Sequence, residues 1–361
     1  SVSAFLLNRS SDLSLKQDNN NCYIMKQDPN QRVFYLDLLR VFATFAVIFL
    51  HVCGSELLAA SPSRNWYIEV AGSGLVRWCV PVFVMISGAL FLVPSRKVTY
   101  REILTIRLSR LLIAYVFWTV VYYFVFGYQG EFSIRGLMLS HFHLWFLPML
   151  MGVYLLIPFL RNIAKNNMMM HYALAIWLFY IFVSSFQFLT AIKMMEHFYP
   201  LFNMNIVVGY CGYFLLGYFL SQHPFLKRQR LLMYLLGVGS VLITIFGTYY
   251  LSNTKGEEDS RLFSNLSIQT IVISTAVLLV AKELAPKCGK AIMNAVGFVR
   301  KDLFGIYLIH ALWIPVVDTN MFRHCCSEII TLPLITIIVF VLSLFTTKLI
   351  RLVPILRKVV E

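Results

Sequence analysis

The sequence predicts an all-α membrane protein, a polytopic bundle of about ten transmembrane helices with both termini in the cytoplasm. Three observations indicate this class. Hydrophobic residues make up 59% and charged residues only 13% of the 361 residues, and the mean hydropathy is +0.72, which is far from the composition of a soluble globular domain. Long apolar runs recur along the chain, and Lys and Arg collect between them. The net charge of +14 therefore reflects membrane topology, and no basic repeat indicates binding to nucleic acid.

The chain divides into a tail and one membrane domain. Residues 1–30 are polar and contain no apolar stretch long enough for a signal-peptide core, so we expect a flexible cytoplasmic tail there. Whether translation starts at Met25 stays open. The membrane domain covers 31–361, and its apolar runs are each long enough to cross about 30 Å of hydrocarbon as a helix. These runs are 33–53, 74–94, 108–127, 143–160, 171–190, 206–222, 231–251, 262–281, 302–317 and 329–350.

The loops between the runs give the orientation. With the N-terminus inside, most of the 31 Lys and Arg fall on the cytoplasmic side, as the positive-inside rule requires. The few on the outer side are Arg64, Arg135, Lys193, Lys255, Arg261 and Arg323. We therefore expect both termini to be cytoplasmic. No paired broken helices, the mark of a transporter built from inverted repeats, can be found in the two halves.

The first run, YLDLLRVFATFAVIFLH, contains three residues that are costly in a membrane: Asp37, Arg40 and His51. Each costs about 2.5–3.5 kcal/mol or more near a bilayer centre. At 100° per residue, Arg40 and His51 point in almost the same direction and lie about 16 Å apart along the helix. We expect one polar stripe that faces the bundle interior or a watery cavity. The alternative is a structural ion pair of Asp37 with Arg40 and a histidine satisfied in the core.

Polar groups gather at two further places. RLSR begins the third run, and its Arg107 and Arg110 lie on one helix face, where two guanidinium groups can bind phosphate; ordinary flanking by positive charge is the alternative. The outer ends of other runs carry His141, Arg77, His143, Trp145, Tyr307 and His310. Each of these alone is typical of an interfacial residue, but together with His51 they predict an acceptor site. Ser87 and Gly88 predict close helix packing, and no Cys or His spacing indicates a metal site.

The chain resembles acyltransferase family 3, a family of membrane O-acyltransferases, in five segments that follow the family's order: LDLLRVFATFAVIFLH, VPVFVMISGALFL, RLSR, HLWFL and GIYLIH. The resemblance covers nearly all of the chain from Tyr35 to His310. It is nearest to bacterial inner-membrane enzymes that O-acetylate sugars of surface polysaccharides, including enterobacterial common antigen. Two details differ, because the last span reads KLIRLVP where many members have a Glu-Arg-Pro ending, and RLSR has no Trp between its arginines.

The resemblance implies that acetyl-CoA binds from the cytoplasm as acyl donor and that a sugar hydroxyl at or beyond the membrane accepts the acetyl group. No permanently bound cofactor is expected. Arg40 and His51 match the family's Arg-x10-His pair, and Arg107 and Arg110 match its cytoplasmic arginine pair. The expected partners are acetyl-CoA, a glycan or lipid-linked sugar, and membrane lipids.

The chemistry of these side chains suggests a role for each. A sugar hydroxyl must lose its proton during attack, and neutral histidine suits that task, so we expect His51 to be the general base. Arg40, paired with Asp37, would orient the donor or stabilise the thioester oxygen. The phosphates of coenzyme A would bind to Arg107 and Arg110.

Four alternatives stay open. A transporter or flippase for an anionic or glycolipid substrate would also place charged groups in the membrane. The donor could be succinyl or a longer acyl-CoA. His51 could carry the acyl group covalently, and the helix could continue past His51 through SELLAA, which would place this histidine at mid-membrane. The sugar, its hydroxyl and the oligomeric state are not encoded in any motif.

Overall fold

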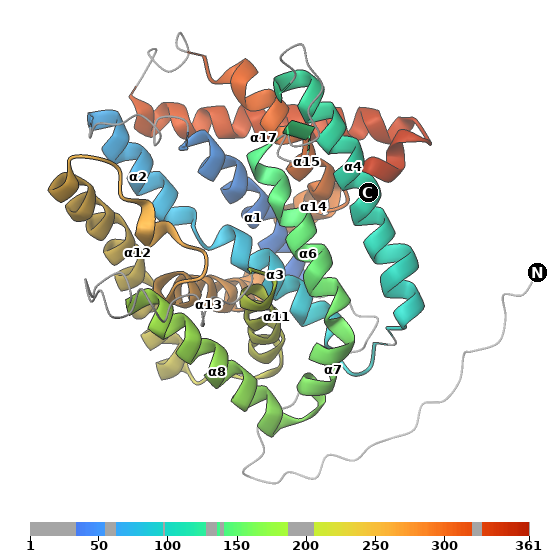
Figure 1. The fold of residues 1–361 in the computed structure, drawn as a ribbon, viewed down its shortest axis with the longest axis vertical. Helices are drawn as coiled ribbons and strands as arrows, with labels where there is room; N and C mark the ends of the chain where they lie inside the picture. The colour runs from blue at the N-terminus through green and yellow to red at the C-terminus, as the bar shows by residue number, and fades with distance from the viewer. Residues whose placement is uncertain are drawn as a thin grey trace, which may run out of the picture. The chain divides into compact units, whose positions relative to one another are not determined.

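The computed structural model describes residues 34–54, 63–96, 98–127, 136–137, 141–186, 206–319 and 327–360. The predicted tail, 1–30, and the segment after His51 that would lengthen the first helix lie outside these ranges. Within the described ranges all regular structure is helical (Figure 1). The all-α class is thereby confirmed.

The helices follow the predicted apolar runs. They are α1 (Phe34–Val52), α2 (Arg64–Val76), α3 (Cys79–Phe91), α4 (Ser109–Tyr122), α6 (Phe146–Leu155), α7 (Ile157–Lys165), α8 (Asn167–Phe186), α11 (Ile206–Gln222), α12 (Lys227–Lys255), α13 (Ile268–Leu284), α14 (Lys290–Val299), α15 (Leu303–Val317) and α17 (Glu328–Leu352). Short π-helical turns are η1 (Glu102–Leu108) and η2 (Tyr123–Gly127), and 3-10 turns are η3 (Phe142–Trp145), η4 (Ser260–Phe263), η5 (Ala285–Lys287) and η6 (Leu356–Val359).

The described residues show fewer helices of spanning length than the ten spans that the sequence predicts. Seven described helical segments are long and apolar enough to cross a membrane, and α6 with η3 and α7, bent by 54°, makes an eighth. The predicted runs 206–222 and 302–317 are helical, but α11 has 17 residues and α15 has 15, whereas a perpendicular span needs about 20. Ten spans and the cytoplasmic termini therefore stay predictions, while the multi-pass membrane bundle is confirmed.

One helix boundary and one additional helix also differ from the predicted runs. The second span begins at Arg64 rather than 74, because Ser63 caps α2 by accepting a hydrogen bond from the Trp66 amide at 3.1 Å. The short helix α14 is absent from the prediction, since its ten residues fall below the length of a span. The segment between α13 and α15 consequently contains a short helix.

Helix α1 lies at the centre of the bundle (Figure 1) and packs against α2, α3, α13, α15 and α17. Most of its side chains are buried. The polar residues of α1 therefore face other helices and not lipid, as the sequence predicts for such a stripe.

Helix α3 is held close to α11 by a pair of glycines. A Cβ atom on Gly88 of α3 would overlap the Phe214 carbonyl oxygen of α11, and one on Gly217 of α11 would overlap the Met85 carbonyl oxygen of α3. The predicted role of Gly88 in close packing is confirmed. This contact holds α3 against α11. Phe83 and Ser87 of α3 line the cavities described below.

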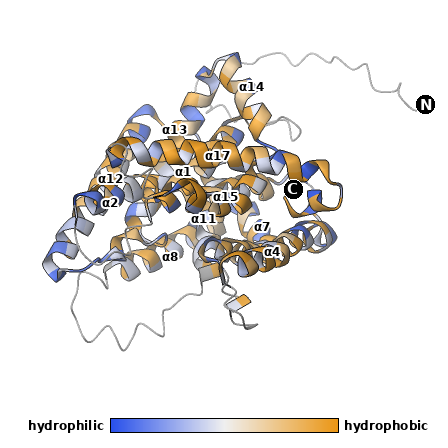
Figure 2. Ribbon diagram, turned by 90° about the horizontal axis from the view of Figure 1, so that it is seen from above, coloured by the Kyte–Doolittle hydropathy of each residue, from blue (hydrophilic) through white to orange (hydrophobic). Residues whose placement is uncertain are grey.

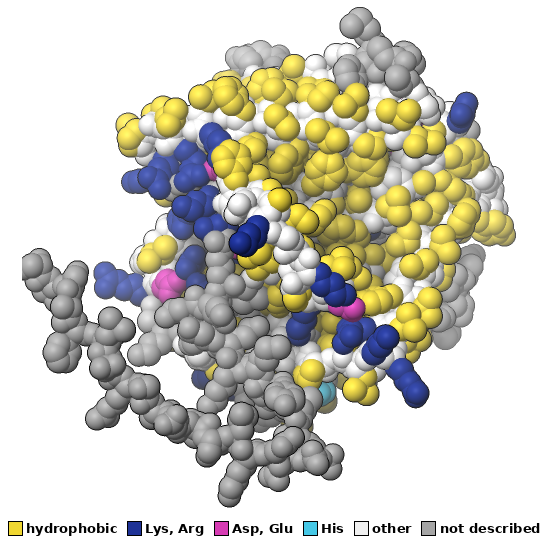
Figure 3. Space-filling model, turned by 180° about the vertical axis from the view of Figure 1, so that it is seen from behind, with side chains coloured by type: hydrophobic (Ala, Val, Ile, Leu, Met, Phe, Trp, Pro, Cys, Tyr) yellow, Lys and Arg dark blue, Asp and Glu magenta, His cyan; other side chains and the backbone are white. Residues whose placement is uncertain are grey.

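The periphery is apolar. Large exposed hydrophobic side chains recur at helical spacing along the outer faces of α12 and α17, for example Leu235, Leu242 and Phe246 on α12 and Ile330 and Val341 on α17. Figure 2 shows hydrophobic residues along the helices and hydrophilic ones mainly towards their ends. Figure 3 shows a broad hydrophobic surface, with most of the Lys and Arg side chains in view lying in a band from the left edge to the lower right. Such a surface is stable in lipid and would associate in water.

An ion cluster ties α15 to the C-terminal part of α17. The buried carboxylate of Asp302, the N-cap of α15, binds Lys348 at 2.9 Å and also pairs with Arg351. Both cations belong to the segment KLIRLVP that departs from the family's usual ending. The cluster fixes the junction of α14 and α15, where Arg300 lies.

Candidate functional site

His51 in the last turn of α1 and His310 in the middle of α15 form a hydrogen-bonded pair. The prediction that His310 ends its span is therefore wrong. His51 Nδ1 lies 2.8 Å from His310 Nε2, and the two rings stack with their centroids 5.1 Å apart. His310 is fully buried. The two residues are 259 positions apart in the sequence, so only the packing of α15 on α1 brings them together.

The hydrogen-bond partners define the tautomers of this pair. His310 Nδ1 lies 2.6 Å from the Tyr307 carbonyl oxygen, which can only accept, so Nδ1 of His310 carries the hydrogen. The Nε2 of the neutral His310 ring must then accept, and His51 Nδ1 donates to it. The remaining nitrogen of His51, Nε2, consequently holds a free electron pair. This is the arrangement that a general base requires.

A second pair of histidines lies next to the first. His141 and His143 approach with their Nδ1 atoms 2.7 Å apart, so one ring donates to the other. Burial lowers the pKa of His141 to about 4, which makes that ring neutral at pH 7. His143 is almost completely buried, and its Nε2 has no hydrogen-bond partner among the described residues. The Tyr307 hydroxyl donates to the His143 carbonyl oxygen and so fixes η3 onto α15.

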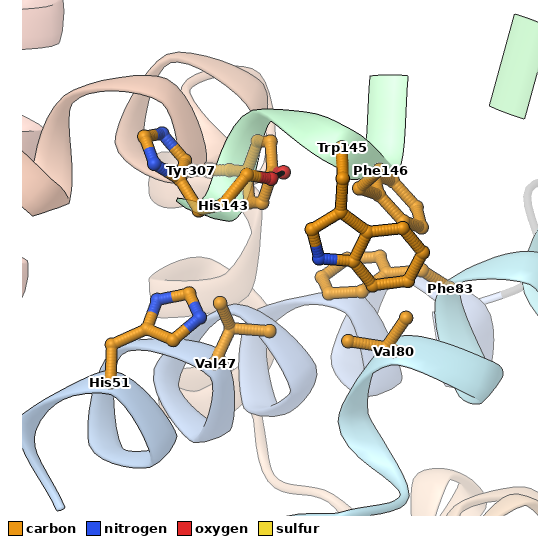
Figure 4. A pocket seen from close by; sticks show the side chains of 8 residues that line it. All are labelled: Val47, His51, Val80, Phe83, His143, Trp145, Phe146 and Tyr307. Carbon is orange, nitrogen blue, oxygen red and sulfur yellow. Dashed lines mark hydrogen bonds between the residues drawn. The ribbon is translucent and has the colours of Figure 1, made fainter. Parts of the chain in front are cut away.

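A small pocket separates His51 from η3 (Figure 4). His51 lies on one side, His143 and Trp145 on another, and Phe83 and Val80 come from α3. Its lining is Val47, His51, Val80, Phe83, His143, Trp145, Phe146 and Tyr307. The pocket leaves about 20 Å³, room for one water-sized group such as a hydroxyl.

A larger cavity adjoins this pocket. It measures about 300 Å³, and its polar lining residues are Arg40, Ser87, Tyr154, Arg300 and Tyr307. Phe83, Phe146 and Tyr307 line both spaces, so these three aromatic residues lie where the two spaces adjoin. The two ends of the predicted polar stripe of α1 therefore line two neighbouring spaces.

Several predicted site residues meet in these spaces. His51, His143, Trp145 and Tyr307 line the small pocket, and His310 lies directly behind His51. Arg40 lines the large cavity and also forms the predicted ion pair with Asp37, with 3.5 Å between Arg40 Nη1 and Asp37 Oδ1. Arg40 thus both pairs with Asp37 and lines the large cavity.

Three predicted site residues lie elsewhere. Arg107 pairs with Glu102 at 2.8 Å, and Arg110 is exposed. Neither arginine is among the residues that line the large cavity, although Leu111, directly after Arg110, lines it. Arg77 stacks on the ring of Phe263, 4.0 Å from its centroid, and lies outside the histidine pocket.

The sequence missed two residues of the site. Arg300 resembles any flanking arginine, since it lies beside Lys301 and follows AIMNAVGFV, an apolar stretch too short to cross a membrane. Tyr122 of α4 is fully buried, with its ring centroid 4.4 Å from His141 and 4.9 Å from His143. Among the described residues no group of three or more His, Cys, Asp or Glu side chains is arranged to hold a metal ion.

Comparison with known proteins identifies relatives. The model of a family described as an acyltransferase domain matches residues 33–350. Probable poly-β-1,6-N-acetyl-D-glucosamine export proteins of Staphylococcus aureus are similar in sequence. The protein of strain MRSA252 is 22% identical over 267 residues, which cover 69% of this chain and 71% of that protein. The protein of strain MSSA476 is 22% identical over 266 residues with the same coverage. No solved structure matches the chain.

Proposed function

Because the chain belongs to acyltransferase family 3, whose domain extends over residues 33–350, we propose that it is a membrane O-acetyltransferase of the bacterial inner membrane. It moves an acetyl group from cytoplasmic acetyl-CoA to a sugar hydroxyl of a cell-envelope polysaccharide or of its lipid-linked precursor. The observation that carries the proposal is the hydrogen bond of 2.8 Å between His51 and His310 beside a pocket that adjoins an arginine-lined cavity.

In this proposal His51 is the base of a direct transfer. The sugar hydroxyl enters the small pocket, its oxygen attacks the thioester carbonyl carbon, and its proton passes to His51 Nε2. The carbon–sulfur bond then breaks, and the same proton passes to the departing thiolate. The products are an acetyl ester and free coenzyme A. His310 holds the tautomer of His51 throughout, much as a buried carboxylate does in other histidine-based sites.

In this proposal His143, and not Arg40, stabilises the negative charge that develops on the thioester oxygen. Arg40 lies three helical turns, about 16 Å, from His51 along α1, which is too far for contact with a thioester carbonyl at His51. His143 belongs to the pocket lining, and its Nε2 lacks a hydrogen-bond partner among the described residues. With Nδ1 of His143 accepting from His141, Nε2 carries a hydrogen that stabilises the developing oxyanion.

Export of a polysaccharide is the second candidate function. The similar staphylococcal proteins are named as probable export proteins for poly-β-1,6-N-acetyl-D-glucosamine, and a polar stripe within a membrane bundle also suits a substrate path. The two functions differ in one chemical event, because only the acetyltransferase cleaves the thioester.

The test uses purified full-length protein, radiolabelled acetyl-CoA and a cell-envelope glycan fraction. We expect free coenzyme A to form only when the glycan is present, with label in the glycan. His51→Gln removes the base and should lower the rate by about 10²-fold or more. His171→Gln, which changes an exposed histidine of α8, is the matched control and should leave the rate unchanged.

Each outcome has one meaning. Full activity of His51→Gln with an unchanged melting temperature would exclude His51 as the base. Glycan flux into vesicles without thioester cleavage would replace the acetyltransferase by an exporter. Label bound to the protein in the absence of glycan would show a covalent acyl-histidine in place of direct transfer.

A further inference from the structure

The cavity beside the histidine pocket contains two arginines from different helices. Arg40 belongs to α1, and Arg300 follows the last residue of α14. The Nε of Arg300 is buried and has no hydrogen-bond partner among the described residues. A buried donor without an acceptor is costly in free energy, so this position is one that a ligand oxygen would satisfy.

No carboxylate in the described part of the chain forms an ion pair with Arg300. Asp302, two positions further along, is held by Lys348 and Arg351. Asp37 lies 3.5 Å from Arg40, a long ion pair. Two guanidinium groups thus share a space of about 300 Å³ with one carboxylate, Asp37, nearby. The cavity therefore favours an anion.

Apart from Ser87, Tyr154 and Tyr307, the remaining lining is apolar and leads towards the histidine pocket. It consists of Phe83, Leu111, Phe146, Leu147, Leu150, Leu303 and Phe304. Phe83 and Phe146, with Tyr307, also line the space next to His51. A ligand that fits both spaces has an anionic group at one end and a long slender arm that passes these rings.

We propose that Arg40 and Arg300 bind phosphate oxygens of the acyl donor, whose pantetheine arm passes Phe83, Phe146 and Tyr307 to place the thioester at His51. This inference rests on the proposed acetyl transfer. The guanidinium fork donates two parallel hydrogen bonds to phosphate oxygens. The 16 Å or so between Arg40 and His51 along α1 is a distance that an extended pantetheine arm spans.

The donor phosphates thereby bind at a different place from the one that the sequence predicts. The sequence assigned them to Arg107 and Arg110, but Arg107 is engaged by Glu102 at 2.8 Å and Arg110 is exposed. Neither faces the cavity that adjoins the histidines. The phosphate site accordingly lies at the junction of α14 and α15, where Asp302 and its two cations hold the backbone in place.

Calorimetry with purified full-length protein tests the assignment. The ligands are coenzyme A, 4′-phosphopantetheine and pantetheine, which lacks phosphate. Arg300→Met should weaken binding of both phosphate-bearing ligands about tenfold or more, which corresponds to the loss of at least one charge-assisted hydrogen bond. Binding of pantetheine should not change. Arg300→Lys keeps the charge without the fork and should fall between Met and the unmodified protein.

Lys290→Met is the matched control, because Lys290 is exposed at the other end of the same short helix. It should bind coenzyme A like the unmodified protein. A melting curve with an unchanged midpoint shows that Arg300→Met is folded, and if its midpoint falls, Arg300→Lys carries the test.

The outcomes separate this inference from the proposed function. Unchanged coenzyme A affinity of Arg300→Met, with a tenfold loss in Arg107→Gln with Arg110→Gln, overturns the inference and leaves acetyl transfer intact. Loss of co-purified phospholipid from Arg300→Met at unchanged coenzyme A affinity assigns the cavity to a lipid headgroup instead. Absence of coenzyme A binding by the unmodified protein contradicts the proposed donor and this inference together.

Discussion

His310 acts on the substrate only through His51, since its Nε2 is occupied by His51 Nδ1 and its Nδ1 by the Tyr307 carbonyl oxygen. It is a positioning residue in this account. The acceptor for His51 Nδ1 is a neutral ring rather than a carboxylate, so the pair avoids placing another buried charge in the membrane.

Replacement of His310 tests this role. His310→Ala leaves His51 free to adopt the other tautomer, so kcat should fall about 10²-fold while KM for acetyl-CoA stays near its original value. His310→Gln supplies a side-chain oxygen that can accept from His51 and should recover part of kcat. Equal kcat values for the Ala and Gln variants would show that the histidine serves only as packing.

The sequence predicts part of this site at the level of single residues. The helical period places Arg40 and His51 on one stripe, and the structure puts both in the lining of adjoining spaces. The pairing of His51 with His310 could not be read from the sequence, because it depends on how two distant helices pack. Arg300 was missed for the same reason, since its cavity exists only after α14 and α15 fold against α1.

At the scale of elements, α3 positions Phe83, one of the three aromatic residues that line both spaces, and the position of α3 depends on its contact with α11 through Gly88 and Gly217. The apolar runs predict the existence of these helices, and the small residue predicts close packing. Their partners are not predictable from the runs, because any apolar helix can pack against any other in lipid.

Gly88→Leu tests the α3–α11 contact. Its side chain would meet the Phe214 backbone, which cannot move as a flexible side chain can, so we expect destabilisation by about 3 kcal/mol, the upper part of the usual range for overpacking. The melting temperature of the purified protein measures this effect. Gly239→Leu is the control, since no atom lies within 4 Å of a Cβ there. Equal melting temperatures for the two variants would contradict the packing argument.

Asp302 links α15 to α17 and offers a second test at this scale. Asp302→Asn removes the charge that holds Lys348 and Arg351 and should cost about 3 kcal/mol, the low end for a broken buried pair because both cations remain partly exposed. The chemical denaturation midpoint should fall accordingly. If the losses measured for Asp302→Asn and Lys348→Gln simply add in the double variant, the two charges are not coupled.

For the whole molecule, the apolar periphery and the helix lengths establish a multi-pass membrane protein, while its orientation stays a prediction from the distribution of Lys and Arg. Seven or eight described segments meet the length and apolarity of a span. The shorter α15 carries His310 and Tyr307, so the deficit in length falls on a helix of the site. A sequence pattern of apolar runs cannot reveal such shortening, because it counts residues and not depth.

Cysteine labelling in intact cells measures the orientation. In a background with Cys325 and Cys326 changed to serine, Glu257→Cys in the α12–α13 connection should react with a membrane-impermeant maleimide. Lys358→Cys near the C-terminus should react only after permeabilisation; both parent residues are exposed. The reverse pattern would place the termini outside and contradict the positive-inside assignment.

The most direct measurement of the central claim is the acetyl ester content of envelope polysaccharide by mass spectrometry. The strains compared lack the native gene and express either the unmodified chain or His51→Gln. The account predicts that His51→Gln abolishes the acetyl ester while the amount of polysaccharide at the cell surface stays the same. An unchanged acetyl content together with loss of surface polysaccharide would contradict acetyl transfer and establish export.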